Sequence, residues 1–233
     1  MQRQYKAIDE CLTKKISRRV KEIWTMLNER FLNIDTVCKS PLPSKMWDGS
    51  ELWIGSETKK AKHNDKEAYG CCDYYWIRKC RNILNPNQTD IFYDLGSGMG
   101  RVVSIFAQKK LKQCVGIELS EGLCDIARSN AERLRRRKAP IEIRCEDVTQ
   151  SDLSDGTIFF LVNPFGADTL KDVLRNVERS LIDNSRHVKI AYYNPVQAEV
   201  FESCKWLRKY REIHTFHGYA ITFWENIETV KTV

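Results

Sequence analysis

The sequence has no long hydrophobic run, and no stretch approaches the roughly 20 apolar residues that a membrane-spanning helix needs. Met1 is followed by Gln-Arg-Gln-Tyr-Lys, which is not the basic stretch and apolar segment of an export signal. Internal repeats and low-complexity segments are also absent from the sequence. We therefore expect a protein of the cytoplasm or the nucleus that is not secreted and has no membrane partner.

Paired CxxC motifs are lacking as well, although the chain has nine cysteines. Their number is odd and they are spread from Cys11 to Cys204, so we expect buried, reduced thiols rather than a disulfide scaffold. Cys71, Cys72 and Cys80 have histidines in the sequence around them but not the spacing of a zinc site. No metal is expected.

The composition is that of a globular protein, with 233 residues, 42% hydrophobic and 30% charged. This length accommodates one sizeable core and an appendage. The net charge of +7 points to an anionic partner, but residues 1–30 alone carry eight basic and four acidic side chains. The excess positive charge is therefore concentrated in the N-terminal segment and not in the remainder of the chain.

This N-terminal segment has the periodicity of one amphipathic helix of about 25 residues. Its apolar stripe consists of Tyr5, Ile8, Leu12, Ile16, Val20, Ile23, Leu27 and Phe31. One interpretation packs the stripe on the main domain and leaves the basic side chains in water. The other uses it for dimerisation or for docking a partner.

The chain then passes through an irregular connector at residues 38–70 into alternating strands and helices. Loops of that length are commonly lids or binding loops, and this one contains two tryptophans. Strands are predicted at 91–95, 114–118, 141–145, 157–163, 187–193, 206–213 and 216–225, and helices at 74–84, 101–111, 121–136, 169–181 and 197–203. Such alternation predicts an α/β fold with a doubly wound, mostly parallel sheet.

A glycine loop follows the first of these strands, in Ile91-Phe-Tyr-Asp-Leu-Gly-Ser-Gly-Met-Gly-Arg101. Glycines at 96, 98 and 100 permit a sharp turn, and the helix that follows offers free N–H donors to a ligand. The spacing GxGxG differs from both the dinucleotide fingerprint and the Walker loop. The glycine turn and the helix N-terminus after it still indicate a nucleotide-like ligand.

Three acidic residues lie where the first three strands end. Asp94 ends the first strand, Glu118 the second, and Asp147 follows the third. In an open parallel sheet all three meet at the carboxyl edge, where ligands bind. A carboxylate about 20 residues beyond the glycines can accept hydrogen bonds from a ribose, and one a strand further on can accept from an adenine amino group.

Residues 88–225 resemble the class I S-adenosylmethionine-dependent methyltransferases, on Asp94-Leu-Gly-Ser-Gly-Met-Gly100, Gly116-Ile-Glu118, Glu146-Asp147 and Val162-Asn-Pro-Phe-Gly166. The resemblance implies a seven-stranded sheet with an antiparallel last strand and S-adenosyl-L-methionine as cofactor, leaving as S-adenosyl-L-homocysteine. It divides the chain into an N-terminal helical extension and lid (1–87) and a cofactor-binding domain (88–233). By position, the implied cofactor-binding residues are Asp94, Leu95, Gly96, Ser97, Gly98, Gly100, Glu118, Leu119, Asp147, Val148 and Asn163.

The turn Asn163-Pro-Phe-Gly166 follows the fourth strand, where the resemblance places the transferred methyl group. The motifs are most similar to histone-lysine methyltransferases of the telomeric-silencing-disruptor type and to bacterial methyltransferases with an Asn-Pro-Phe-Gly turn. The telomeric type has a second Asn where Pro164 stands. The predicted catalytic residues are Asn163, Pro164 and Phe165, with Tyr69 and Tyr75 as aromatic covers of the sulfonium; Tyr74, Tyr192, Tyr193 and Asn194 are further candidates for such a cover. A purely structural turn is the alternative.

These observations lead to a methyltransferase whose acceptor is an amine, such as a protein lysine. A small-molecule N- or O-methyltransferase with residues 38–75 as a lid is an alternative, and a silent cofactor-binding module is another. Nucleic acid is less favoured as a substrate, because the basic run from Arg133 to Lys138 ends a helix whose dipole it complements. That helix end is expected at the opposite edge of the sheet from the methyl donor.

Overall fold

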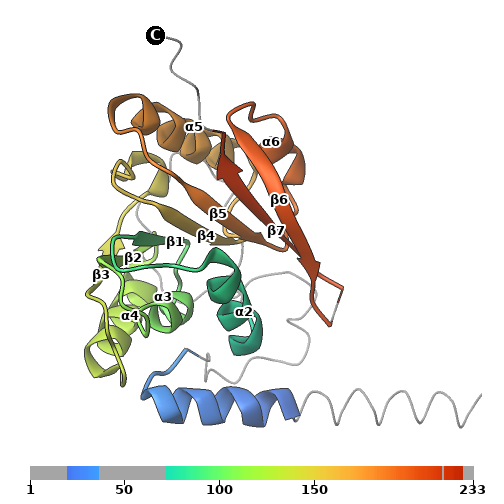
Figure 1. Ribbon diagram of the computed structural model, residues 1–233. Coiled ribbons are helices and arrows are strands. Elements are labelled where there is room, and N and C mark those ends of the chain that lie inside the picture. The colour runs from blue at the N-terminus through green and yellow to red at the C-terminus, as the bar shows by residue number, and fades with distance from the viewer. Residues whose placement is uncertain (1–19, 37–71, 217, 228–233) are drawn as a thin grey trace, which may run out of the picture.

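A computed structural model describes residues 20–36, 72–216 and 218–227. Its centre is a seven-stranded sheet in the order β3-β2-β1-β4-β5-β7-β6 (Figure 1). The strands are β1 (Ile91–Leu95), β2 (Gln113–Glu118), β3 (Ile141–Cys145), β4 (Ile158–Val162), β5 (Lys189–Tyr193), β6 (Leu207–His214) and β7 (Ala220–Asn226). The first five strands are parallel, and β7 runs antiparallel to both β5 and β6. The predicted fold class is confirmed.

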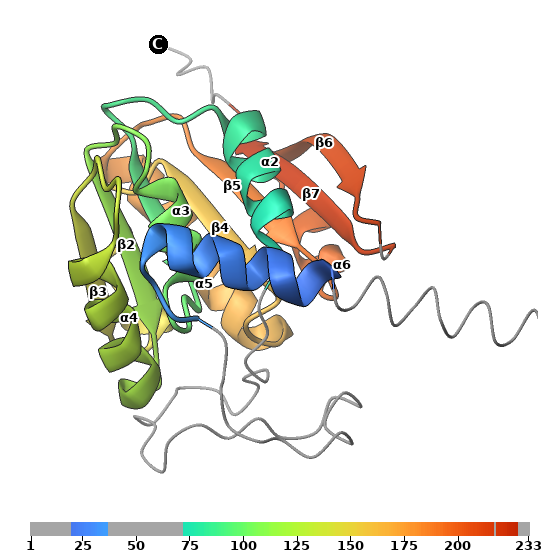
Figure 2. The ribbon, with the colours of Figure 1, turned by 90° about the horizontal axis from the view of Figure 1, so that it is seen from below.

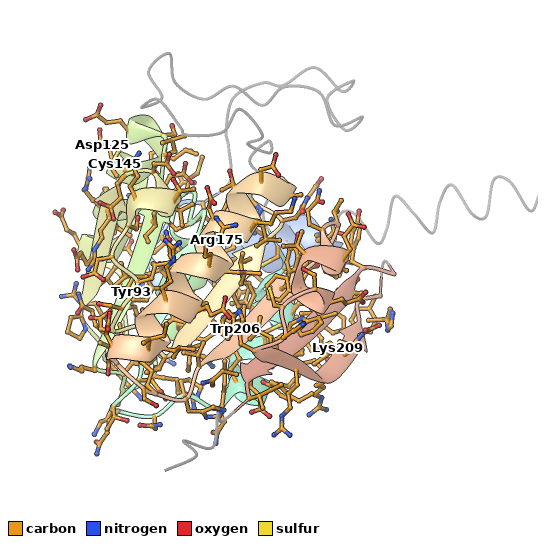
Figure 3. All side chains as sticks on the ribbon, turned by 90° about the horizontal axis from the view of Figure 1, so that it is seen from above. Tyr93, Asp125, Cys145, Arg175, Trp206 and Lys209 are labelled. Atoms are coloured by element: carbon orange, nitrogen blue, oxygen red, sulfur yellow. The ribbon has the colours of Figure 1, made fainter. Side chains whose placement is uncertain are left out.

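Helices cover both faces of this sheet. They are α2 (Tyr74–Leu84), α3 (Arg101–Phe106), α4 (Glu121–Arg133), α5 (Ala167–Asp183) and α6 (Ala198–Glu202), with a 3-10 turn η1 at Val148–Gln150. The helices α2, α3 and α4 lie on one face, and α5 and α6 on the other (Figures 1 and 3). Each face has its own hydrophobic core.

The burial of the strands explains their composition. The central strands β1 and β4 are apolar almost throughout because helices cover both of their faces. The edge strand β6 is mostly exposed and carries charged side chains, which protect a free edge from pairing with another chain. Since the first five strands are parallel, the loops that follow β1, β2, β3 and β4 meet at one edge.

Several element boundaries differ from those predicted, and the largest difference is at the end of α3. The helix after the glycine loop ends at Phe106 and not at 111, because the chain turns there and Lys109 donates its N–H to the Phe106 carbonyl at 2.9 Å. The short turn η1 was not predicted; it begins at Val148, directly after a side-chain cap from Asp147.

A helix over residues 20–32, here called the N-terminal helix, crosses α2, α3 and α4 on the side away from the sheet (Figure 2). Packing of the apolar stripe on the main domain is wrong for the described part of this helix. Val20, Ile23, Leu27 and Phe31 are exposed, whereas Leu32 is fully buried. The helix therefore turns a different side to the protein. The earlier stripe residues, from Tyr5 to Ile16, lie outside the described residues.

The segment just before the glycine-loop strand belongs to the main core. Tyr74, Ile77 and Leu84 of α2 are buried in one cluster with Phe92 and Phe106. The division of the chain at residue 87 stays a prediction, and the described residues on its two sides share this core. The connector at 38–70 lies outside the described residues.

Within the described ranges, no helix is long and apolar enough to span a membrane. The cysteines of these ranges are free thiols, namely Cys72, Cys80, Cys114, Cys124, Cys145 and Cys204. No group of three or more potential metal ligands occurs among the same residues.

Candidate functional site

The glycine loop is fastened to the neighbouring strand by its own backbone. The N–H groups of Gly96 and Ser97 both donate to the Ile117 carbonyl at 2.9 Å, and Gly100 donates to the Ser97 carbonyl at 2.9 Å. Gly96, Gly98 and Gly100 have φ values of 79°, 52° and 78°. Only glycine adopts this left-handed region at little cost, so the three glycines produce the sharp turn from β1 into α3.

Gly96 also brings two loops of the site together. A Cβ atom added to it would collide with the ring of Pro164, so the backbone of the glycine loop lies directly against the turn after β4. The sequence predicted both segments at one edge of the sheet. Their direct contact is a result of the tertiary structure.

The carboxylate of Glu118 organises the space between β1 and β2. One oxygen accepts the N–H of Gly98 at 2.9 Å, and the other accepts the N–H groups of Leu119 and Ser120, each at 2.9 Å. Glu118 thus holds the glycine loop and the start of α4 in one arrangement. A half-buried carboxylate at the end of β2 is where the ribose of the cofactor was predicted, and the structure places it accordingly at the loop.

Asp94 is buried beside this loop, and burial raises its pKa to about 8, with the nearby Glu118 carboxylate as the second cause. Its Oδ2 atom, like the buried Oγ of Ser97, has no hydrogen-bond partner in the part of the chain that the structure describes. Buried polar atoms are normally paired, so such a pair of orphaned atoms fits a polar ligand. Together with the left-handed glycine turn beside them, the residues present fit S-adenosyl-L-methionine.

Asp147 follows β3 and lies near the same edge, because the N–H of Glu146 donates to the Glu118 carbonyl at 3.0 Å. One oxygen of the Asp147 carboxylate caps η1 by accepting the N–H and the hydroxyl of Thr149, at 2.9 and 2.8 Å. Val148, the next predicted cofactor residue, is buried. Contact of Asp147 with adenine stays a prediction, and the capping role is an additional finding.

The turn after β4 is built around Asn163. This residue has a left-handed backbone, with φ of 44°, and its Oδ1 atom accepts the hydroxyl proton of buried Tyr192 at 3.0 Å. The same hydroxyl accepts the N–H of Gln197 at 3.3 Å. Tyr192, which the sequence suggests as an aromatic cover, therefore holds the Asn163 side chain through this hydrogen bond. Phe165 is packed in the core formed with α5, as Leu95 is, and their predicted roles at the site are untested.

The residues predicted to cover the sulfonium lie in different surroundings. Tyr69 lies outside the described residues. Tyr75 is half exposed on α2 and stacks with Phe216 of the loop between β6 and β7, at 5.7 Å between ring centroids. Phe216 was not predicted, because it lies more than 100 residues from the glycine loop and no local motif marks it. Tyr193 is buried, and Asn194 follows it with a φ of 52°.

A polar cluster behind the glycine loop was also missed. Arg101, the first residue of α3, is buried and donates to Thr36 Oγ1 at 2.7 Å and to the Cys72 carbonyl at 3.1 Å. Its guanidinium carbon lies 4.7 Å from the ring centroid of Tyr74, which is also buried. An ion pair with Glu29 at 3.4 Å completes the cluster. In the sequence Arg101 is an ordinary helix residue, since its partners come from two distant segments.

Comparison with known proteins agrees with this site. Residues 55–155 match the model of the family described as histone methylation protein DOT1. A comparison with curated proteins gives no match. The matched range includes the glycine loop, Glu118 and Asp147, and ends before Asn163.

Solved structures share the fold. An RNA methyltransferase from Salinibacter ruber, in complex with S-adenosyl-L-homocysteine, is 23% identical with a TM-score of 0.54, and the alignment covers 70% of this chain and 98% of that one. An O-methyltransferase from Thermotoga maritima has 14% identity and a TM-score of 0.54, over 69% and 68% of the two chains. An rRNA methylase from Streptococcus thermophilus has 11% identity and a TM-score of 0.51, over 65% and 96%.

The family match and the fold lead to one classification. The chain has the fold of the class I S-adenosylmethionine-dependent methyltransferases, and the family model and this fold both point to S-adenosyl-L-methionine as its cofactor. The residues that would hold it are Glu118, Ser97 and the backbone of the glycine loop.

Proposed function

We propose that this S-adenosylmethionine-dependent methyltransferase transfers the methyl group to an amine nitrogen, and that the amine is a lysine side chain of a protein. The observation that carries the proposal is the position of Asn163. Its side chain is fixed by Tyr192 at the end of β4, and its turn lies against the glycine loop through Pro164 and Gly96.

An amine places specific demands on such a turn. Its N–H groups need acceptors, while its lone pair must stay free and point at the methyl carbon. The Asn163 Oδ1 atom uses one lone pair for Tyr192 and retains the other, and Pro164 contributes a backbone carbonyl but has no N–H. The turn therefore offers acceptors, as an amine donor requires.

The remaining tasks of the chain are to hold and orient the reactants and to exclude water. S-adenosyl-L-methionine, when bound, supplies an electrophilic methyl group on a sulfonium. A neutral amine is already a nucleophile, so positioning it accounts for most of the catalysis, and proton removal needs no dedicated base at the reacting nitrogen. This fits a site in which the Glu118 carboxylate is engaged with the glycine loop rather than with the Asn163 turn.

The choice of a protein lysine is supported by the family model over residues 55–155, whose description names histone methylation. The exposed, stacked pair of Tyr75 and Phe216 supports it as well, because a large acceptor needs an open, partly apolar surface on the enzyme. A small-molecule acceptor and a silent cofactor-binding module are the competing functions that the experiment must separate.

The test is transfer of radiolabelled methyl groups into the protein, nucleic-acid and small-molecule fractions of a source-cell lysate. We expect label in protein, recovered as methyl-lysine after hydrolysis, and its loss with Asn163→Ala. Asn184→Ala is the matched control, because Asn184 is an exposed asparagine whose side-chain amide donates to the Ser154 carbonyl of a loop at the other edge. Label in RNA or a small molecule contradicts the lysine assignment. Cofactor binding without any transfer favours the silent module.

A further inference from the structure

The N-terminal helix presents an apolar surface outward. Its large hydrophobic side chains keep between 47% and 61% of their surface exposed; they are Val20, Ile23, Trp24, Met26, Leu27 and Phe31. All but Met26 follow one stripe, since residues three, four and seven apart share a helix face. Side chains of this size are seldom exposed together on a monomer, and such a surface usually marks an interaction site.

The opposite side of this helix explains why the stripe faces outward. Asn28 accepts from Arg78 Nη2 at 2.7 Å, Glu29 pairs with Arg101, and Lys21 pairs with Asp73 at 3.2 Å. These polar contacts, with buried Leu32, fix the rotation of the helix about its own axis. Turning the stripe inward would leave several partly buried charges without partners, which costs more free energy than burial of the stripe recovers.

A group of arginines borders the C-terminal end of the stripe. The guanidinium carbon of Arg136 lies 4.2 Å from the ring centroid of Phe31, and the N–H of Arg135 donates to the Leu32 carbonyl at 2.9 Å. Arg30 and Arg133 complete this arginine group, and all four side chains are exposed. No carboxylate of the described residues lies within 4.0 Å of their charged nitrogens.

Between the helix and the end of α4 the surface is hollowed. The hollow has a volume of about 480 Å³ and is lined by Met26, Glu29, Arg30, Asn33, Ile34, Asp35, Arg133 and Arg135. Its charged lining consists of three arginines and two carboxylates, Glu29 and Asp35, and the Glu29 carboxylate is already bonded to Thr36 and Arg101. The stripe and the hollow together therefore form an apolar ridge that ends in a positively charged recess.

We propose that this surface docks a protein segment that is helical, apolar on one side and acidic on its flanks. The apolar side of the segment packs on the stripe, as an amphipathic helix packs in a groove, and its carboxylates bind the arginine group. Arginine is suited to this role because its planar fork can bind a carboxylate through two parallel hydrogen bonds. The proposal does not depend on which acceptor is methylated.

The charges argue against a second copy of this chain. A parallel pair of stripes would set two arginine groups side by side. An antiparallel pair would set each group near Lys21 of the other copy. Like charges in either arrangement oppose association.

Nucleic acid and lipid fit less well. Trp24 and Phe31 can stack on bases, but the rest of the stripe, Val20, Ile23 and Leu27, is aliphatic, offers nothing to phosphates and does not stack. A helix that lies on a membrane keeps its polar face in water with cations along it. Here that face is packed on the protein, and Lys21 is already paired.

The test starts from the full-length chain and a library of randomised, helix-forming peptides displayed on phage. Selection should enrich peptides with apolar residues three and four apart and Glu or Asp beside them. A synthetic copy of an enriched peptide should bind at least about tenfold more weakly to Ile23→Glu/Leu27→Glu than to the unmodified chain. Ile182→Glu is the matched control, since Ile182 is an exposed isoleucine on α5 at the opposite face.

The arginine group is tested by reversing charge. Arg135→Glu/Arg136→Glu should have an affinity for the acidic peptide that is lower by a similar factor. The same variant should bind more tightly to a version of the peptide with Lys in place of each acidic residue. Arg179→Glu on α5 should change neither affinity. Unchanged circular dichroism and cofactor binding show that the variants fold.

Several results would overturn the proposal. One is a selection that enriches no acidic amphipathic peptide, and another is an enriched peptide that binds Ile23→Glu/Leu27→Glu as tightly as it binds the unmodified chain. The others are concentration-dependent dimers in sedimentation, binding to phosphatidylserine vesicles, or binding to single-stranded RNA, each abolished by Ile23→Glu/Leu27→Glu. Those outcomes assign the surface to a second copy, a lipid surface or a nucleic acid.

Discussion

The Arg101 guanidinium forms an ion pair at 3.4 Å with the Glu29 carboxylate, although 72 residues separate them in the chain. Both side chains are largely buried, at 7% and 12% exposure. Arg101 is the first residue after the glycine loop, and Glu29 belongs to the N-terminal helix. The pair therefore joins the outer layer of the molecule to the glycine loop, where the cofactor is predicted to bind.

Removing one partner of this pair should destabilise the fold and weaken the cofactor site together. We expect Arg101→Met to lower the free energy of unfolding by about 3 kcal/mol, because it leaves the Glu29 carboxylate without its counter-charge and the Thr36 hydroxyl oxygen without the guanidinium donor. Glu29→Gln should cost less, since Arg101 keeps Thr36 and Cys72. Urea unfolding and calorimetry of S-adenosyl-L-methionine binding measure both effects.

The control for this pair is Arg175→Met, which removes the ion pair of the exposed Arg175 guanidinium with Asp172 on α5. Its cost should stay within about 0.5 kcal/mol, and cofactor affinity should not change. Equal losses from Arg101→Met and Arg175→Met would contradict a link between the N-terminal helix and the glycine loop.

Gly96→Ala should damage the site through contact with Pro164, beyond its backbone strain. Gly218 provides the matched control: its φ is 83°, close to the 79° of Gly96, but no atom lies within 4 Å of an added Cβ. Both substitutions should lower the free energy of unfolding by about 1 kcal/mol because of the left-handed backbone. Only Gly96→Ala should lower it by about 1–3 kcal/mol more, because of overpacking. Thermal unfolding of both variants checks the difference, and equal shifts would refute the contact.

Glu118→Gln should lower the affinity for S-adenosyl-L-methionine by about tenfold or more. An amide can replace only one of the two acceptor oxygens, so either Gly98 or the pair Leu119 and Ser120 loses its partner. Glu121→Gln, on the exposed first turn of α4, is the control and should bind normally. Undiminished affinity in the Glu118 variant would place the cofactor elsewhere.

Tyr192→Phe should slow methyl transfer while leaving cofactor affinity nearly unchanged. The substitution removes the hydroxyl that orients Asn163, and the loss of one hydrogen bond corresponds to roughly a tenfold change in rate. Steady-state kinetics separate kcat from the Kd of the cofactor. Tyr210→Phe, on the edge strand β6, serves as the control. A loss confined to cofactor binding would remove Asn163 from the acceptor site.

Asp94 makes the stability of the free protein depend on pH. In the unfolded chain its carboxyl has a pKa of about 3.9, whereas burial raises the folded pKa to about 8. The folded state holds the extra proton between these values, so this contribution to stability is complete below the unfolded pKa and is lost as pH rises through about 8. The slope is at most about 1.4 kcal/mol per pH unit.

The matching experiment compares the unfolding free energy of the unmodified chain and of Asp94→Asn at several pH values from about 6 to 9. We expect the difference to grow in favour of the variant as pH rises. A difference that does not change with pH would show that Asp94 is ionised in the folded protein.

The sequence by itself determined the elements that positioned the cofactor site. Strand 91–95 was predicted with the bounds that it has, because a short apolar run before a glycine loop admits few structures. Parallel strands then brought Asp94, Glu118 and the turn at Asn163 to one edge. The amphipathic pattern of the N-terminal helix was also visible in the sequence.

Tertiary structure alone decided which way that helix faces and what supports the site. An amphipathic pattern defines two sides of a helix but not which side is buried, and here the buried charges of Glu29 and Arg101 outweigh the apolar stripe. The contacts of Tyr192 with Asn163 and of Gly96 with Pro164 join separate segments. Local propensity carries no information about such partners, because they meet only when the sheet is assembled.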